Sequence, residues 1–159
     1  MPAPFPLTIA PISPLIIERK DCPMVRQIVK DPLFLSRKSA PAVQTDLPIV
    51  QDLLDTLHAN SDRCVGLAAN MIGFHKRIIV FSAGFFSIPM INPEIIRREQ
   101  PYEAEEGCLS LPGTRKTTRY RTIEVRYLDR NFKPCRQVYT DWIAQIIQHE
   151  VDHCDGILI

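Results

Sequence analysis

Near the end of the chain, two histidines lie four positions apart in an HExxH motif. The surrounding sequence predicts a helix from Asp141, a favourable N-cap residue, to Gly156, because apolar residues recur at helical spacing at Ile143, Ile146, Ile147 and Val151. Residues four apart share one face of a helix, so His149 and His153 point the same way, with the Glu150 carboxylate beside them. This pattern can hold a metal ion next to a general base, and it places that chemistry on a core helix.

Elsewhere the sequence predicts one more long helix and a hairpin. Capping residues and an apolar stripe at helical spacing indicate a helix over residues 47–59. Residues 77–82 are typical of a buried strand. Residues 122–128 alternate with period two, and a turn then leads into a second strand at 135–140.

Prolines interrupt the apolar run at residues 87–93, so any strand there is expected to be irregular or at a sheet edge. The strand is expected to continue through residues 94–99. Strands that lie between two separated helices, without alternation of strand and helix, indicate an α+β fold.

Composition places the chain among ordinary globular domains. A length of 159 residues and 45% hydrophobic content suit one domain with a true core, and a net charge of +1 offers no basic field for nucleic acid. Five cysteines without a framework spacing favour a reducing, cytoplasmic compartment. We expect a proline-rich, extended or disordered N-terminal extension at 1–23 without a signal peptide or membrane span, and a catalytic domain at 24–159.

A catalytic metal needs a third protein ligand and an open position. HExxH also recurs by chance, so two incidental histidines on a core helix are the alternative interpretation. Few residues follow His153, and Cys154 and Asp155 are expected to point away from the ligand face of the helix. The third ligand is therefore sought upstream, where Cys108 lies in an acidic loop beside Gly107.

Three stretches, in this order, resemble the peptide deformylase family. Residues 64–71, CVGLAANM, resemble the family's GφGφAAxQ motif with both end residues changed. Residues 106–110 match EGCLS, and residues 148–156 match QHExDHLxG except at Cys154. The resemblance covers about residues 24–159, and three ordered motifs are far more specific than one.

The resemblance implies antiparallel sheets around a central C-terminal helix, and a hydrolase that removes the formyl group from N-formylmethionyl peptides. Cys108, His149 and His153 would hold the metal, and Glu150 would act as general base. The metal would be Fe²⁺, with Zn²⁺, Ni²⁺ or Co²⁺ as replacements. The implied partners are N-formylmethionyl nascent peptides, with transient ribosome proximity, and neither nucleic acid nor membrane.

The resemblance also implies substrate-binding residues: Val65, Gly66, Glu106, Arg115, Trp142 and Ile146. Val65 and Gly66 would pair with the substrate backbone, while Trp142, Ile146 and Leu109 would line the methionine pocket; each apolar residue could equally be plain core. Asp152 or Gln148 would orient the imidazoles. Arg115 and Arg119 would contact the peptide, pair with an acid such as Asp152, or remain solvated.

One departure from the family limits the expected activity. The family's glutamine donates a hydrogen bond to the oxyanion beside the backbone N–H at the Leu109 position, but here that glutamine is Met71, which has no donor. Asn70, in a segment expected to be extended, would point to the other face. Gln145 falls where the family has an apolar pocket residue, so it would either alter the side-chain preference of the pocket or face elsewhere. Deformylase activity is therefore expected to be weakened. The alternatives are a catalytically impaired metal-binding protein that binds N-terminal peptides, and a general HExxH peptidase.

Overall fold

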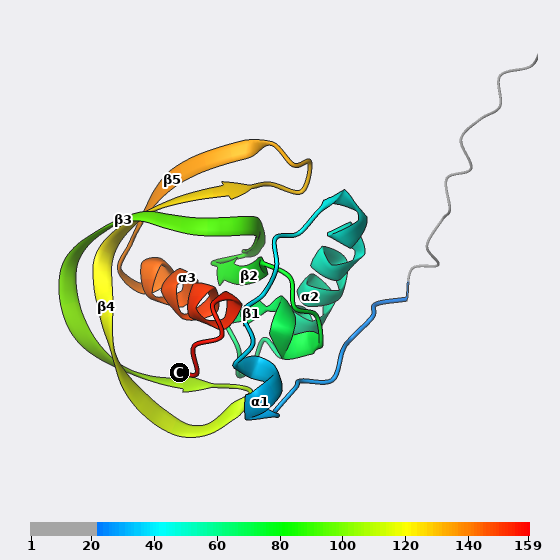
Figure 1. The fold of residues 1–159 in the computed structure, drawn as a ribbon, viewed down its shortest axis with the longest axis horizontal. Coiled ribbons are helices and arrows are strands. Elements are labelled where there is room, and N and C mark those ends of the chain that lie inside the picture. The colour runs from blue at the N-terminus through cyan, green and yellow to red at the C-terminus, as the bar shows by residue number, and fades with distance from the viewer. Residues whose placement is uncertain (1–21) are drawn as a thin grey trace, which may run out of the picture.

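A computed structural model describes residues 22–159. All but the last two residues of the expected N-terminal extension lie outside the described part. Five antiparallel strands form one sheet in the order β1-β2-β3-β4-β5 (Figure 1). The strands are β1 (Gly66–Ala68), β2 (Ile78–Ala83), β3 (Phe86–Cys108), β4 (Leu111–Leu128) and β5 (Pro134–Thr140). The helices are α1 (Pro32–Leu35), α2 (Leu47–Ala59) and α3 (Asp141–Cys154), with short 3-10 turns η1 (Gln44–Asp46) and η2 (Ala69–Ile72).

The long ribbon of β3 and β4 curves around α3, which lies in the middle of the molecule (Figure 1). Helix α3 packs against β1, β2 and β4, whereas α2 packs on β2 and β1. Fully buried apolar side chains from these elements meet in one core, including Leu53, Leu67, Ile79, Ile123 and Ile147. The sheet and its helices confirm the expected α+β class, with an antiparallel sheet around the C-terminal helix.

Both predicted helices are present, although the start of α3 differs from the expectation. Helix α2 spans the predicted residues, and the hairpin of β4 and β5 is also confirmed. Asp141 is not the N-cap of α3. The chain enters the helix through Asp141 in a left-handed conformation, with φ 52°, and Thr140 occupies the cap without a side-chain hydrogen bond. The extended N-cap residue is therefore Thr140, one position before the predicted one, and the chain turns sharply at Asp141.

The proline-containing start of β3 behaves as predicted. Residues 86–90 pair with β2 alone, because pairing with β4 begins at Ile91, and the register then shifts between Ile91 and Glu94. An open side and a bulge both tolerate the missing N–H of proline. Beyond this point the ribbon is far longer than predicted, since β3 continues to Cys108 and β4 begins at Leu111.

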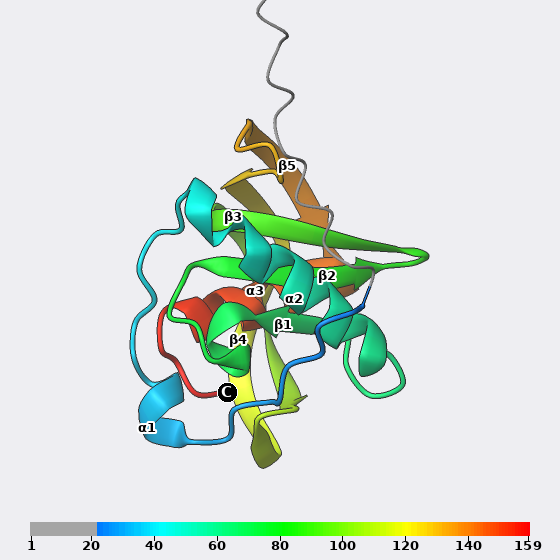
Figure 2. The ribbon, with the colours of Figure 1, turned by 90° about the vertical axis from the view of Figure 1, so that its right-hand side faces the viewer.

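Figure 2 shows the same elements from the side, with α2 in front of β1 and β2. No helix in the described range is long and apolar enough to span a membrane. The cysteines are all free.

Candidate metal centre

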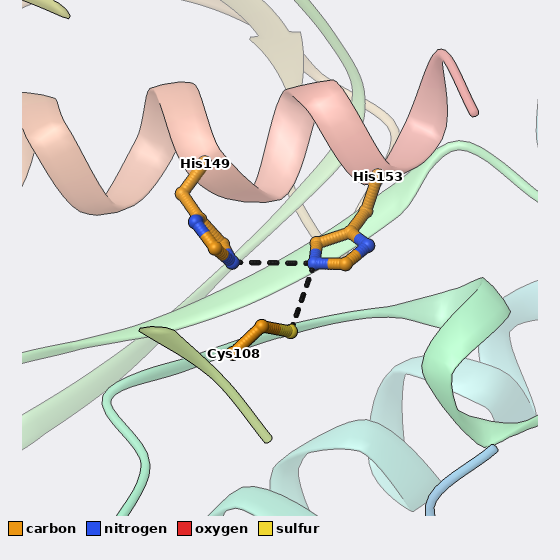
Figure 3. A group of neighbouring side chains, drawn as sticks. All are labelled: Cys108, His149 and His153. Atoms are coloured by element: carbon orange, nitrogen blue, oxygen red, sulfur yellow. Dashed lines mark hydrogen bonds between the residues drawn. The ribbon is translucent and has the colours of Figure 1, made fainter. Parts of the chain in front are cut away.

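Three donor side chains converge where the end of β3 approaches α3 (Figure 3). Cys108 Sγ lies 3.3 Å from His153 Nε2, and this nitrogen lies 3.2 Å from His149 Nε2. The three donor atoms lie within 4.8 Å of one another. A thiol and two imidazole nitrogens that face one common point fit the donor set of a transition-metal ion. Residues 22–159 thus bring together the three predicted ligands.

Glu106 fixes the orientation of the His149 ring. Its Oε1 lies 3.0 Å from His149 Nδ1, so this ring nitrogen donates to Glu106 and leaves Nε2 directed toward Cys108 and His153. Arg119 donates to the same carboxylate through Nε and Nη2, at 2.7–3.1 Å. Burial alone would raise the pKa of Glu106, but the hydrogen bonds from His149 and Arg119 lower it to about 2. Glu106 therefore stays ionised.

The two residues expected to orient the imidazoles do not contact them, so that expectation is wrong. Asp152 accepts from Arg119 Nη1 at 2.6 Å. Gln148 is turned toward β4, where its amide bonds the backbone N–H and C=O of Tyr120. Glu106 fills the orienting role, although it was expected to bind substrate. An acid two residues before a metal-ligating cysteine was the available sequence signal.

His153 has a different environment from His149. Its Nδ1 is buried without a hydrogen-bond partner among the described residues. Burial lowers the pKa of His153, and the positive charges of His149 and Arg119 lower it further. The ring is therefore neutral at physiological pH, as a metal-ligating imidazole must be.

Glu150 is the only acid of the HExxH motif that faces the pocket, and it is 3% exposed. Its Oε2 has no hydrogen-bond partner in the described range, and burial raises its pKa to about 7. Gly66 allows this carboxylate to approach β1, because a Cβ at Gly66 would lie 2.9 Å from Glu150 Oε1 and from Ile146 Cγ2. A carboxyl group that titrates near neutral pH can accept and return a proton.

A pocket of about 200 Å³ adjoins Glu150 and His149. Most of the predicted site residues line it: Val65, Gly66, Met71, Glu106, Cys108, Leu109, Trp142 and Ile146. Gln145 also lines it, at the position expected for an apolar pocket residue, and further residues contribute, namely Arg63, Cys64, Glu105 and Gly107. Arg115 is absent from this lining. It pairs in register with Glu106 across the β3–β4 ribbon, and its Nη1 is buried without a partner in the described part.

A larger hollow of about 1140 Å³ lies between α2 and residues 22–26 and 73–76, and none of the predicted site residues lines it.

The wall of the pocket that carries Met71 has no free amide donor. Met71 is 1% exposed and belongs to η2, so residues 69–72 form a 3-10 turn and are not extended as expected. The side chain of Asn70 nevertheless faces away from the pocket, because its Nδ2 donates to the backbone oxygens of His153 and Leu35. Asn70 therefore cannot replace the missing glutamine.

Comparison with known proteins gives a consistent result. Residues 25–159 match the family described as Polypeptide deformylase. A peptide deformylase of Clostridium beijerinckii is 60% identical over 136 residues, which cover 86% of this chain and 100% of that protein. A peptide deformylase of Caldanaerobacter subterraneus subsp. tengcongensis is 36% identical over 134 residues, covering 82% of each. The structure of a Met-Ala-Ser-bound class I type b peptide deformylase from Acinetobacter baumannii has a TM-score of 0.77 and 28% identity, covering 84% of this chain and 96% of that one.

Proposed function

Because the chain belongs to the peptide deformylase family, we propose that Cys108, His149 and His153 hold its metal ion and that Glu150 is its general base. The chain is a metal-dependent hydrolase that removes the formyl group from N-formylmethionyl peptides. The observation that carries the residue assignment is the convergence of three donor atoms within 4.8 Å, beside a buried carboxylate.

The reaction adds water to the formyl carbon and breaks the C–N bond, giving formate and a free amine. The Cys108 thiolate and the neutral imidazoles of His149 and His153 would hold the ion and leave one coordination position open, where the ion would supply Lewis-acid chemistry that lowers the pKa of water. Glu150 accepts the proton of the attacking water and delivers it to the departing nitrogen. Its raised pKa of about 7 supports both transfers at neutral pH, since the carboxylate form accepts and the acid form donates.

Substrate binding is assigned to the residues that line the pocket. Trp142, Ile146 and Leu109 form an apolar surface for the methionine side chain. β1 is an edge strand of the sheet, so we assign its open side, at Val65 and Gly66, to pairing with an extended peptide; the Val65 carbonyl already accepts from Ser82 N–H at 2.8 Å. The backbone N–H of Leu109 is assigned as the donor to the formyl oxyanion. We do not assign Glu106 to substrate binding, because its carboxylate oxygens accept hydrogen bonds from His149, Arg119 and Gln145.

We propose Fe²⁺ as the native ion because it is the ion typical of the family; one thiolate and two imidazoles also suit Zn²⁺, Ni²⁺ and Co²⁺ as replacements. The free cysteines support a reducing, cytoplasmic compartment, where nascent chains emerging from the ribosome supply the substrate.

Formate release tests the function directly. Protein purified anaerobically with Fe²⁺ is incubated with formyl-Met-Ala-Ser, and formate is measured alongside metal content. We expect turnover by the wild type and a sharp loss of bound metal in Cys108→Ser. Cys135→Ser, which changes a thiol outside the pocket, is the matched control and should keep both metal and turnover. Unchanged metal content in Cys108→Ser would refute the ligand assignment.

A second candidate, favoured by the donor-free side chain of Met71, is a protein that binds formylated N-terminal peptides with little turnover. Full metal occupancy without formate release, combined with measurable peptide binding, would support this candidate against the first.

A further inference from the structure

Gln145 lies at the wall of the pocket, but both ends of its amide bond to the protein. Its Nε2 donates to Glu106 Oε2 at 2.9 Å, and its Oε1 accepts from the Tyr102 hydroxyl at 3.0 Å. Tyr102 belongs to β3 and Gln145 to the first turns of α3, so these bonds join two elements far apart in the chain. The side chain therefore links α3 to two residues of β3, one of which is the carboxylate that holds His149.

The two oxygens of Glu106 share one donor, Arg119 Nε, and each has further donors of its own. Oε1 also receives His149 Nδ1 and Arg119 Nη2, whereas Oε2 also receives Gln145 Nε2. A carboxylate held on one oxygen can still turn about its terminal bond, but donors on both oxygens fix its plane. Gln145 is the donor to Oε2 that does not come from Arg119, so its bond adds a second constraint on the plane of the carboxylate and on the position of Oε1, which contacts the His149 ring.

Tyr102 decides which end of the Gln145 amide faces Glu106. The two ends of a glutamine amide are nearly the same size, so only hydrogen bonding separates the two orientations. The Tyr102 hydroxyl donates to Oε1, and this bond directs the NH₂ group at Glu106. In the flipped orientation a carbonyl oxygen would face the ionised carboxylate, which is repulsive.

We propose that Gln145, oriented by Tyr102, is a positioning residue that holds Glu106 and, through it, the metal-facing nitrogen of His149. This inference rests on the assignment of His149 as a metal ligand in the proposed function. A residue one step beyond the direct partner of a ligand should have a smaller effect than that partner, whose loss typically changes metal affinity or activity 10–100-fold.

The test compares Gln145→Leu, Tyr102→Phe and the double variant in the full chain. Each protein is loaded with Co²⁺, whose visible absorption spectrum reports the geometry of its ligands, and the Co²⁺ dissociation constant is measured by competition. We expect Gln145→Leu to weaken Co²⁺ binding by about 3–10-fold, to shift the spectrum, and to lower kcat with KM changed less than about 2-fold. Tyr102→Phe should act in the same direction with a smaller effect.

The double variant should match Gln145→Leu alone, because Tyr102 acts only through Gln145. The inference would be overturned if the effects of Gln145→Leu and Tyr102→Phe on Co²⁺ binding added in full in the double variant. It would also be overturned if Gln145→Leu kept the wild-type Co²⁺ spectrum and affinity. The matched control is Gln137→Leu, which removes a similar bond to a tyrosine hydroxyl, that of Tyr139, outside the pocket. If Gln145→Leu fails to fold, Tyr102→Phe alone decides, because it removes one oxygen and keeps the ring.

His149→Ala separates this inference from the ligand assignment. Loss of Co²⁺ binding in His149→Ala supports the ligand assignment on which the inference depends. Undiminished Co²⁺ binding in that variant would overturn both the assignment and the inference. Loss of binding in His149→Ala, together with unchanged behaviour of Gln145→Leu and Tyr102→Phe, would overturn the inference alone.

Discussion

The metal-holding wall of the pocket differs from the wall formed by β1 and η2. In the metal-holding wall, Glu106 accepts bonds from His149, Arg119 and Gln145, and Arg119 also bonds to Asp152. The β1–η2 wall contributes Cys64, Val65, Gly66 and Met71. Its only side-chain donor is the Cys64 thiol, which donates to the backbone oxygen of Gly66 at 2.9 Å.

The two walls suit two different tasks of the same pocket, which are metal binding and oxyanion stabilisation. Holding a metal ligand requires an ionised partner, and Glu106 keeps its charge because Arg119 and His149 compensate for burial. Stabilising an oxyanion requires a free donor, which no side chain of residues 64–71 supplies. This chain therefore combines a full set of proposed metal ligands with a pocket wall that lacks a free side-chain donor for the proposed oxyanion site.

The largest effect should come from Glu150, which belongs to the reaction and not to the metal-holding network. Glu150→Gln removes the proton acceptor while keeping the volume of the side chain, so we expect formate release to fall by about 10²–10⁴-fold. Metal content should remain at the wild-type level, since Glu150 is outside the donor cluster. Glu103→Gln, at an exposed position, is the control. Loss of metal in Glu150→Gln would contradict the separation of the two roles.

Two carboxyl groups should give opposite pH dependences of stability in the metal-free protein. Glu106 has its pKa lowered to about 2, so its stabilisation is present above pH 4.5 and is lost as pH falls toward 2. Glu150 has its pKa raised to about 7, so its contribution is present below pH 4.5 and is lost as pH rises through 7. Each effect should reach about 3 kcal/mol at most.

The free energy of unfolding is measured in urea from pH 3 to 8 for the wild type and for each variant. At each pH, the variant's value is subtracted from the wild-type value. The difference for Glu106→Gln should shrink toward low pH, and that for Glu150→Gln should shrink toward high pH. Differences that follow the same direction with pH would show that the two environments are not distinct.

Removing the orienting carboxylate should weaken the metal site without removing a ligand. Glu106→Gln keeps the size of the side chain but loses the charge that pairs with Arg119, so metal affinity should fall by about 10–100-fold. Competition with a chelator measures the affinity. The matching substitution at Asp152, Asp152→Asn, should have a smaller effect, because Asp152 reaches the ring only through Arg119. An equal effect of both substitutions would argue that charge alone matters.

Adding a donor to the β1–η2 wall should raise turnover. Met71→Gln restores the amide that the family places there, and we expect kcat to rise by about 10-fold, below the full value of one oxyanion donor because Met71 is buried in the core. Met71→Leu fills the same space without a donor and should leave kcat near the wild-type value. A gain in both variants would trace the effect to packing.

The smallest effect should come from Gly66, where β1 approaches Glu150. A methyl group in Gly66→Ala would lie 2.9 Å from Glu150 Oε1 and from Ile146 Cγ2, so these groups must move. We expect a loss of stability of about 1–3 kcal/mol and a fall in kcat of a few fold. Thermal unfolding and formate release measure the two changes. Wild-type kcat despite the clash would show that the position of Glu150 is not critical.

The β3–β4 ribbon is much longer than the strands that the sequence predicts. Only the ends of β3 and β4 show the apolar runs and alternation that predict strands, whereas residues 97–107 and 112–122 are largely polar. The register between Glu94 and Cys108 depends instead on backbone pairing with residues 111–126. Such pairing joins residues distant in sequence and leaves little local pattern.

The proposed metal ligands were accessible from the sequence because the patterns that indicate them are local. Helical periodicity places His149 and His153 on one face of α3, and the EGCLS and HExxH motifs identify Cys108 and Glu150. The orienting partner was not accessible in this way. Glu106, Arg119 and Gln145 come from β3, β4 and α3, and only their packing shows that Glu106 contacts His149 while Asp152 and Gln148 face elsewhere. Side-chain partners depend on how separate elements pack against one another. The spacing of residues along the chain does not contain this information.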